Sequence, residues 1–169
     1  IAGIPDEQLD AYVSAGIQNN HECSSAQALL AAYDKGMNIY IREGSAARNA
    51  QALLSCTRDN HLDISRFAFC TDDKHLATIA GEGHISHIVR IARQLGFSWG
   101  ETARMASCNP CRFYRLEKQG NVEENYAADL VIADELCHRI ACVVKDGIPV
   151  AADGRLVHSA ETIRREKPS

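Results

Sequence analysis

The sequence has no long apolar run and no excess of basic residues. No uninterrupted stretch approaches the roughly 20 apolar residues that a membrane-spanning helix needs, so we expect no membrane partner. Lysine and arginine total 18 against 22 aspartates and glutamates, and the net charge of −4 does not suit a nucleic-acid partner. Hydrophobic residues make up 46% and charged residues 24% of the 169 residues, as in a globular protein with one sizeable core.

An even cysteine framework and a secretory signal are also lacking. The seven cysteines are an odd number scattered along the chain, and the first residues show no signal-peptide pattern. Both features favour free thiols in a reducing compartment, so we expect a cytoplasmic protein. The chain starts with Ile1 rather than methionine, and we therefore expect it to be part of a longer protein.

Strand and helix patterns alternate through the first 120 residues. The composition and spacing of apolar residues predict strands at residues 17–20, 37–41 and 66–70. Helices are predicted at about residues 5–15, 24–35, 46–55, 83–95 and 99–107. Asn109 is expected to cap one further helix, with Pro110 in its first turn. This alternation is typical of an α/β protein with parallel strands.

The pattern changes after Gly120, where helical spacing gives way to short strands. Strands are predicted at residues 128–133, 140–145 and 148–151, and Asp146-Gly147 is a hairpin turn signal. We therefore predict a small β region at residues 121–158 after an α/β region at residues 1–120. The charged residues 159–169 are expected to form a frayed tail.

Polar residues follow each of the three predicted parallel strands. These residues are His21, then Arg42 and Glu43, then Asp72 and Asp73. Active sites of parallel α/β proteins are built at this end of the strands. Each residue also has a structural interpretation, because a histidine or aspartate in such a loop often bonds only to backbone or caps a helix.

The two adjacent aspartates are expected to differ in role, because successive side chains at a strand end point to opposite sides. Asp72 lies closer to the strand and is our candidate metal ligand and proton acceptor, with His21 as a second ligand through its neutral imidazole. Asp73 is expected to cap a helix or to support the site from outside.

Three further motifs have alternative interpretations. Arg42 and Glu43 either pair at the surface or, with Ser45, line a polar pocket, and Ser45 alternatively caps the next helix. His84 lies in a loop expected to cover the site. Cys108 and Cys111 form a CxxC motif, but no strand precedes it and no second ligand pair is suitably spaced, so neither redox activity nor zinc binding is favoured.

Several segments resemble the bacterial adenine deaminases of the amidohydrolase superfamily. The specific ones are His21-Glu22, IREGSAARN at 41–49, CTDD at 70–73 and EGHI at 82–85. ASCNPCR at 106–112 and ADLV at 128–131 are similar to that family's "NPAR" helix and "ADLV" strand. The resemblance covers about residues 1–150.

The resemblance implies the last three β/α units of a metal-dependent-hydrolase (β/α)8 barrel plus part of a small β domain. It implies hydrolysis of adenine to hypoxanthine and ammonia in purine salvage, by a homo-oligomeric enzyme that carries Mn2+ or Fe2+, with Zn2+ as an alternative. His21 and Asp72 would bind the metal. Asp72 and Glu43 would be catalytic. The expected purine-binding residues are Arg42, Ser45, Asp73 and His84.

The chain also departs from the superfamily pattern. It lacks the first-strand His-x-His motif, the strand-four carboxylate and the strand-five histidine. Two ligands are too few for a firm metal site, so we expect this chain to be inactive alone. Two alternatives stay open: another cyclic-amide hydrolase, resembling dihydroorotase or hydantoinase, and a non-catalytic α/β module in which the aspartates only cap a helix.

Overall fold

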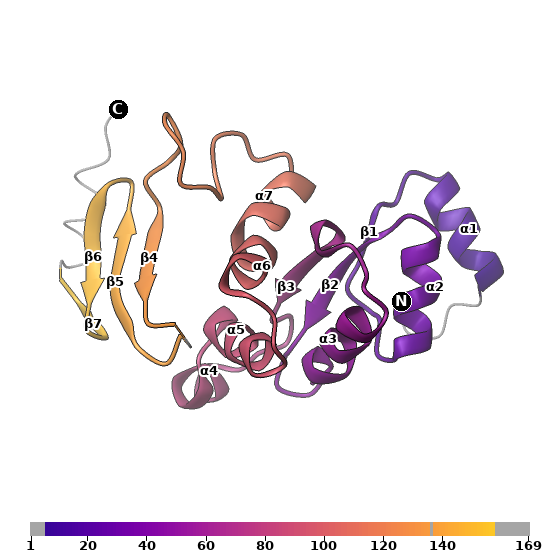
Figure 1. Ribbon diagram of the computed structural model, residues 1–169, viewed down its shortest axis with the longest axis horizontal. Helices are drawn as coiled ribbons and strands as arrows, with labels where there is room; N and C mark the ends of the chain where they lie inside the picture. Colours follow the sequence, from indigo (N-terminus) through magenta and orange to yellow (C-terminus); the bar gives the residue numbers. More distant parts are fainter. Residues whose placement is uncertain (1–5, 136, 158–169) are drawn as a thin grey trace. The chain divides into compact units, whose positions relative to one another are not determined.

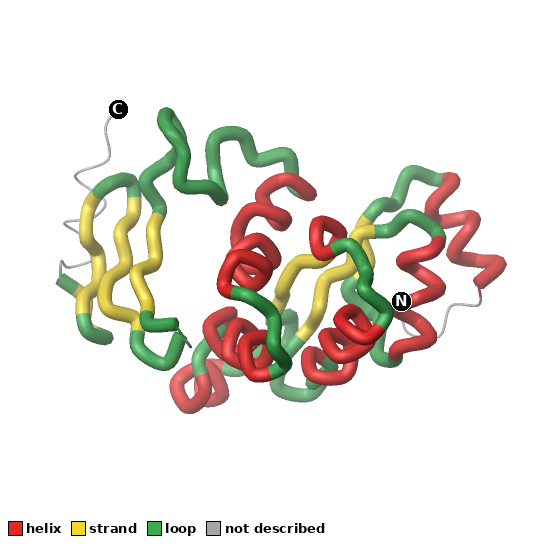
Figure 2. Tube along the Cα trace, viewed as in Figure 1, coloured by secondary structure: helices red, strands yellow, loops and turns green. Residues whose placement is uncertain are grey.

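A computed structural model describes residues 6–135 and 137–157 of the chain. The chain divides into two compact units, one ending at Leu116 and the other beginning at Glu117 (Figure 1). The first unit alternates helices and strands, and the described residues of the second contain strands without helices (Figure 2). The predicted frayed tail, residues 159–169, lies outside the described residues.

Three parallel strands form the sheet of the first unit, in the order β1-β2-β3. Their bounds are Asn19–Asn20 for β1, Asn38–Arg42 for β2 and Phe67–Cys70 for β3. Ile39 lies opposite Phe67, and Ile41 lies opposite Phe69. All four of these side chains are buried, as expected for a parallel sheet covered by helices. The three predicted strands are confirmed.

Helices follow each strand of this sheet. The helices are α1 (Asp6–Ser14), α2 (Ala26–Asp34), α3 (Ala50–Asp59), α4 (Leu76–Glu82) and α5 (Ile85–Gln94), with a 3-10 turn, η1 (Ile64–Arg66), ahead of β3. Ser25 caps α2 by accepting a hydrogen bond from Ala28 N at 3.2 Å. The predicted start of α3 at Ala46 is wrong, because α3 begins at Ala50. Helix α4 was not predicted from the sequence.

One continuous helical segment ends the first unit, and it differs from the two separate helices predicted there. It consists of α6 (Trp99–Ala103), the π-helical turn η2 (Arg104–Cys108) and α7 (Asn109–Phe113). Pro110 has no N–H and its ring would clash with a regular helical carbonyl, so a wider turn before it lets the helix continue.

Asn109 was predicted to cap this helix, and that prediction is wrong. Its side chain is buried, and its Nδ2 donates to Ile64 O at 2.9 Å and to Phe67 O at 2.7 Å. The amide therefore fastens α7 to the start of β3. Ser98 does cap α6, in a capping box with Glu101.

The second unit is an antiparallel sheet in the order β4-β5-β6-β7. Its strands are β4 (Leu130–Ala133), β5 (Ile140–Lys145), β6 (Ile148–Ala152) and β7 (Arg155–Leu156). Asp146 and Gly147 join β5 to β6 with φ values of 51° and 80°, the positive values that this hairpin turn requires. The predicted hairpin is confirmed, and the short strand β7 is an addition. Among the described residues, no helix combines the length and apolar character that crossing a membrane requires.

Candidate functional site

The polar residues that follow β1, β2 and β3 lie at one edge of the parallel sheet. Arg42 pairs with Cys70, so β2 and β3 end at the same level. Strand β1 ends earlier, with Asn20 opposite Ile39, and the chain beyond it reaches Arg42 through Glu22. This edge is where parallel α/β proteins place their active sites. The candidate site is therefore built from three loops that are far apart in the sequence.

Arg42, the last residue of β2, makes hydrogen bonds to residues that follow β1 and β3. Its Nη1 donates to Asp72 Oδ2, after β3, at 2.8 Å and to Glu22 Oε2, after β1, at 3.2 Å. Glu22 Oε1 in turn lies 3.4 Å from His21 Nε2. Glu22 was not among the predicted site residues, although its place beside His21 at a strand end was a usable signal. The structure brings Asp72, Arg42 and Glu22 into one charged chain of contacts.

Glu43 faces away from this chain of contacts, so the alternative in which Arg42 and Glu43 pair at the surface is wrong. The physical reason is the alternation of side chains along β2 and its continuation. Glu43 is only 4% exposed, and its Oε2 accepts a hydrogen bond from Ala50 N at 3.0 Å. Its Oε1 lies 3.7 Å from Arg48 Nη1 and 3.9 Å from His87 Nε2. Glu43 thus satisfies the amino end of α3, which explains why that helix starts at Ala50.

Asp73 ties the loop after β3 to the loop after β2. Its Oδ2 accepts a hydrogen bond from Ala46 N at 2.9 Å, and this bond holds the pKa of the Asp73 carboxyl below its usual value. Helix α4 has His75 as its N-cap residue, so of the two roles expected for Asp73 the helix cap is wrong. Asp72 precedes it with a φ of 49°, a left-handed conformation that turns the chain sharply after the strand.

Ser45 and His84 make specific contacts in the same two loops. Ser45 Oγ accepts from His75 N at 2.9 Å and donates to Thr78 Oγ1 at 2.8 Å. It therefore supports the start of α4, and the alternative in which Ser45 caps α3 is wrong, because Asn49 is the N-cap residue of α3. His84 Nε2 lies 2.8 Å from Thr71 Oγ1, at the end of β3.

A group of charged residues holds the carboxyl end of α4, and we call it the Glu82 cluster. Glu82 Oε1 pairs with Lys74 Nζ at 3.0 Å, and Glu82 Oε2 pairs with Arg48 Nη1 at 3.2 Å. His87 Nε2 lies 3.8 Å from Glu82 Oε2. The Lys74 and Arg48 cations lower the pKa of Glu82 to about 2. The side chain of Lys74 is only 1% exposed, so removing Glu82 would leave a buried cation without this partner.

The resemblance to metal-dependent hydrolases implies a divalent metal, and these residues can be compared with the ligands that such a metal needs. His21 supplies an imidazole and Asp72 a carboxylate, which are suitable donors. Within the part of the chain that the structure describes, however, no three His, Cys, Asp or Glu residues converge as a metal site would need. The described residues therefore do not fit a metal by themselves, and further ligands would have to come from elsewhere.

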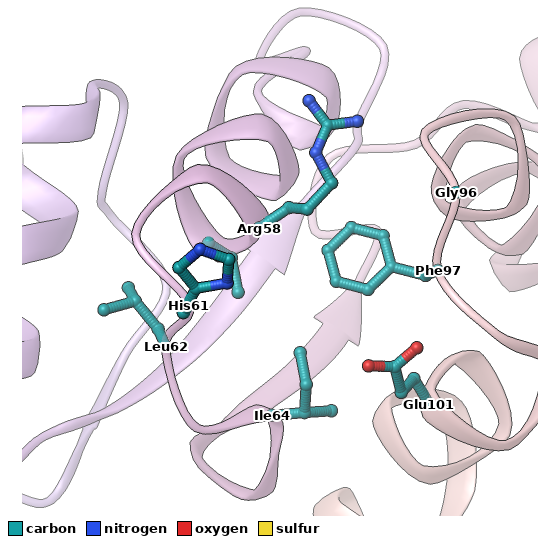
Figure 3. A pocket seen from close by; sticks show the side chains of 8 residues that line it. Arg58, His61, Leu62, Ile64, Gly96, Phe97 and Glu101 are labelled. Atoms are coloured by element: carbon teal, nitrogen blue, oxygen red, sulfur yellow. The ribbon is translucent and has the colours of Figure 1, made fainter.

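A pocket of about 280 Å³ lies apart from these strand ends (Figure 3). It adjoins the turn that precedes β3, and thus the amino end of that strand. Arg58 Nη1 donates to Leu95 O at 2.6 Å, and Glu101 Oε2 accepts from Ser98 N at 2.6 Å, so its charged groups already have internal partners. The lining residues are Thr57, Arg58, His61, Leu62, Ile64, Gly96, Phe97 and Glu101.

Residues 16–152 match the model of the amidohydrolase family. The chain belongs to this family. It is 44% identical over 133 residues to the adenine deaminase of Desulfitobacterium hafniense, covering 79% of this chain and 23% of that protein. It is 39% identical over 158 residues to the adenine deaminase of Kosmotoga olearia, covering 93% and 27%. The chain thus spans about a quarter of the length of these curated relatives.

Solved structures of other proteins have a similar fold. The β-aspartyl dipeptidase of Fervidobacterium islandicum matches with a TM-score of 0.73 and 16% identity, over 94% of this chain and 48% of that one. The N-acetylglucosamine-6-phosphate deacetylase of Thermotoga maritima matches with a TM-score of 0.57 and 16% identity, over 86% and 56%. At these identities the likeness shows the fold alone. The predicted α/β class, with a parallel and an antiparallel sheet, is confirmed.

Proposed function

We propose that this chain is a segment of an adenine deaminase, the enzyme that converts adenine and water to hypoxanthine and ammonia. The observation that carries the proposal is the 44% identity to a protein of that name over most of the chain. In this proposal β1, β2 and β3 are the last three strands of a (β/α)8 barrel, and β4–β7 belong to a small β domain. The matched ends of β2 and β3 support a site shared with the rest of such a barrel.

Asp72 is the proposed proton acceptor for the attacking water. Its carboxylate stands at the end of β3, is 40% exposed, and is oriented by Arg42. From this position it can take a proton from water and return it to the ring nitrogen or the departing amine. His21 and Asp72 would be two of several ligands of a divalent metal, Mn2+ or Fe2+, with the others supplied from outside these residues. When bound, such a metal makes water a better nucleophile by lowering its pKa.

The other predicted site residues divide by their contacts. Ser45 and Asp73 fasten the loops together, so we assign them to shaping the wall of the purine site. His84 is held by Thr71 at the end of β3 and stays a candidate purine contact. Glu43 stays a predicted catalytic residue, although Ala50 N occupies one of its oxygens.

A chimeric enzyme tests this function. The segment of the Desulfitobacterium hafniense adenine deaminase that aligns with this chain is replaced by the matching residues of this chain. With Mn2+ added, the chimera is expected to release ammonia from adenine, whereas residues 1–169 alone release none. Asp72→Ala in the chimera is the matched control and should abolish turnover without loss of folding.

Two results would each contradict one part of the proposal, the substrate or the need for the rest of the barrel. A folded chimera that hydrolyses dihydroorotate or hydantoin but not adenine would reassign the substrate to a cyclic amide. Adenine turnover by residues 1–169 alone would show that the site needs no other part of the barrel.

A further inference from the structure

Two cysteines lie three residues apart on the helical segment that ends the first unit. Cys108 is the last residue of η2, and Cys111 lies in α7. Cys108 and Asn109 have helical φ values of −59° and −65°, so the chain between the two cysteines follows a regular helix. Residues at this spacing share one face of a helix. Both thiols are partly exposed, and burial and the charge of Cys108 raise the pKa of Cys111, as expected of neighbouring sulphurs.

The backbone spacing suits a disulfide between them. Cα atoms three residues apart in an α-helix are about 5 Å apart, which lies inside the range of roughly 4.4–6.8 Å found in disulfides. The corresponding Cβ atoms are about 5–6 Å apart, whereas a disulfide draws them to roughly 3.5–4.5 Å. The bond therefore closes only with a local tightening of the helix, and a disulfide under such strain is readily reduced.

We propose that Cys108 and Cys111 form a reversible thiol–disulfide switch that reacts with small anionic disulfides. An oxidoreductase site of the thioredoxin type has its CxxC motif after a strand, and a helical turn precedes this motif instead. A switch that oxidises only itself has no need of that setting. The inference does not depend on adenine deaminase activity.

Cys108 is the attacking thiol. Arg104 and Arg112 lie about one helical turn before and after it and are exposed, so their charges attract an anionic disulfide. The Cys108 thiolate attacks one sulphur of that disulfide, forms a mixed disulfide and releases one thiolate. The charge of Cys108 is then gone, which removes one cause of the raised pKa of Cys111. Cys111 loses its proton to solvent, attacks the Cys108 sulphur and displaces the second thiolate, so the protein thiols supply the two electrons that reduce the small disulfide.

Asn109 connects this switch to the fold. It lies between the two cysteines, and its buried side chain donates to Ile64 O and Phe67 O. Because oxidation tightens the helix on both sides of Asn109, the disulfide pulls on these two hydrogen bonds. Oxidation should therefore loosen α7 from the start of β3, and reduction should restore the attachment.

Oxidation of the 169-residue chain by glutathione disulfide tests the switch. After alkylation with N-ethylmaleimide and tryptic digestion, mass spectrometry should show peptide 105–112 without alkyl groups and two hydrogen atoms lighter than its dithiol form. Excess glutathione should reverse the change. Cys70 and Cys142 are also partly exposed, and as internal controls they should stay alkylated. Cys111→Ser, which lacks the second thiol, should stop at the mixed disulfide on Cys108.

Arg104→Gln is the matched variant for the role of charge. It should slow oxidation by glutathione disulfide a few-fold, yet leave oxidation by the uncharged hydroxyethyl disulfide unchanged. Hydrogen exchange of residues 111–113 in the wild type should quicken on oxidation and recover on reduction. A helical circular dichroism spectrum before oxidation verifies that each variant is folded.

Each part of the inference has a result that overturns it. Two free thiols at every concentration of glutathione disulfide, or a stable mixed disulfide on wild-type Cys108, would overturn the switch. Equal slowing of both reagents by Arg104→Gln would overturn the selection of anionic disulfides. Unchanged hydrogen exchange on oxidation would overturn the connection through Asn109. None of these results bears on whether the chimera hydrolyses adenine.

Discussion

The Asp73 carboxylate fills the space beside the α-carbon of Gly44. A Cβ built on Gly44 would lie 1.6 Å from Asp73 Oδ1 and 3.0 Å from the carbonyl oxygen of Thr71. The same carboxylate accepts the hydrogen bond from Ala46 N. Glycine at position 44 is thus required by the close approach of the loop after β3, and the two loops determine each other's shape.

Gly44→Ala should destabilise the chain by about 2 kcal/mol, because Asp73 must give up its place and its bond to Ala46 N. Asp73→Ala alone should cost about 1 kcal/mol, the value of one hydrogen bond. In the double variant the added methyl group enters space that Asp73 has vacated. The costs of the two single variants should therefore add up to more than the cost of the double variant, all measured by urea unfolding. Strict additivity would show that Asp73 does not limit position 44.

Asn109→Ala should cost about 2–3 kcal/mol, because the buried side chain no longer donates hydrogen bonds to Ile64 O and Phe67 O. Asn109→Asp should be worse, since it presents an acceptor to two acceptors. If Asn109 were only a helix cap, Asn109→Asp would be tolerated, because aspartate is an equally good cap. Thermal or urea unfolding separates the two cases.

Local signals in the sequence predicted the strands and their ends, because burial on both faces of a parallel sheet gives continuous apolar runs such as FAFC. The Asp146-Gly147 turn was equally predictable from backbone geometry. These features depend on residues within a few positions of one another, so one sequence is enough to find them.

Long-range contacts explain what the sequence did not predict. Helix α4 has no buried residue, so its sequence shows no apolar residues repeating at helical spacing. The residues that hold it, Ser45 and Arg48, lie some 30 residues away in the sequence. Asn109 looked like a cap because its acceptors are more than 40 residues distant. The pairing of Arg42 with Glu22 likewise depends on β1 and β2 lying side by side, which no local pattern in the sequence predicts.

Glu82→Gln should weaken the chain by about 1–2 kcal/mol at pH 7, because Lys74 and Arg48 lose a charged partner. The pKa of Glu82 is lowered from 4.5 to about 2 in the folded chain. The stabilisation is therefore fully present above about pH 4.5 and is lost as the pH falls towards 2. The difference in unfolding free energy between the two proteins should shrink over this range.

Two observations complete the test of Glu82. Hydrogen exchange of residues 76–82 should quicken in Glu82→Gln, because α4 has no buried side chain to hold it. The exposed residue Glu117 supplies the control, and Glu117→Gln should leave both the exchange and the pH dependence unchanged. A pH-independent difference between the wild type and Glu82→Gln would contradict the ion-pair account.

Cys70 offers a chemical reporter of the charges at the strand ends. The pKa of its thiol is raised to about 11, first by burial and then by the charge of Asp72, while Arg42 acts to lower it. Asp72→Asn, which keeps an acceptor for Arg42, should therefore make the thiol more acidic. Its alkylation by iodoacetamide at pH 9 should become a few-fold faster, because the thiolate is the reactive form. Cys23, whose pKa of about 11 is set mainly by burial, is the internal control in the same digest and should react at an unchanged rate. A parallel rise at Cys23 would mean that Asp72→Asn loosens the whole unit and does not act through charge on Cys70.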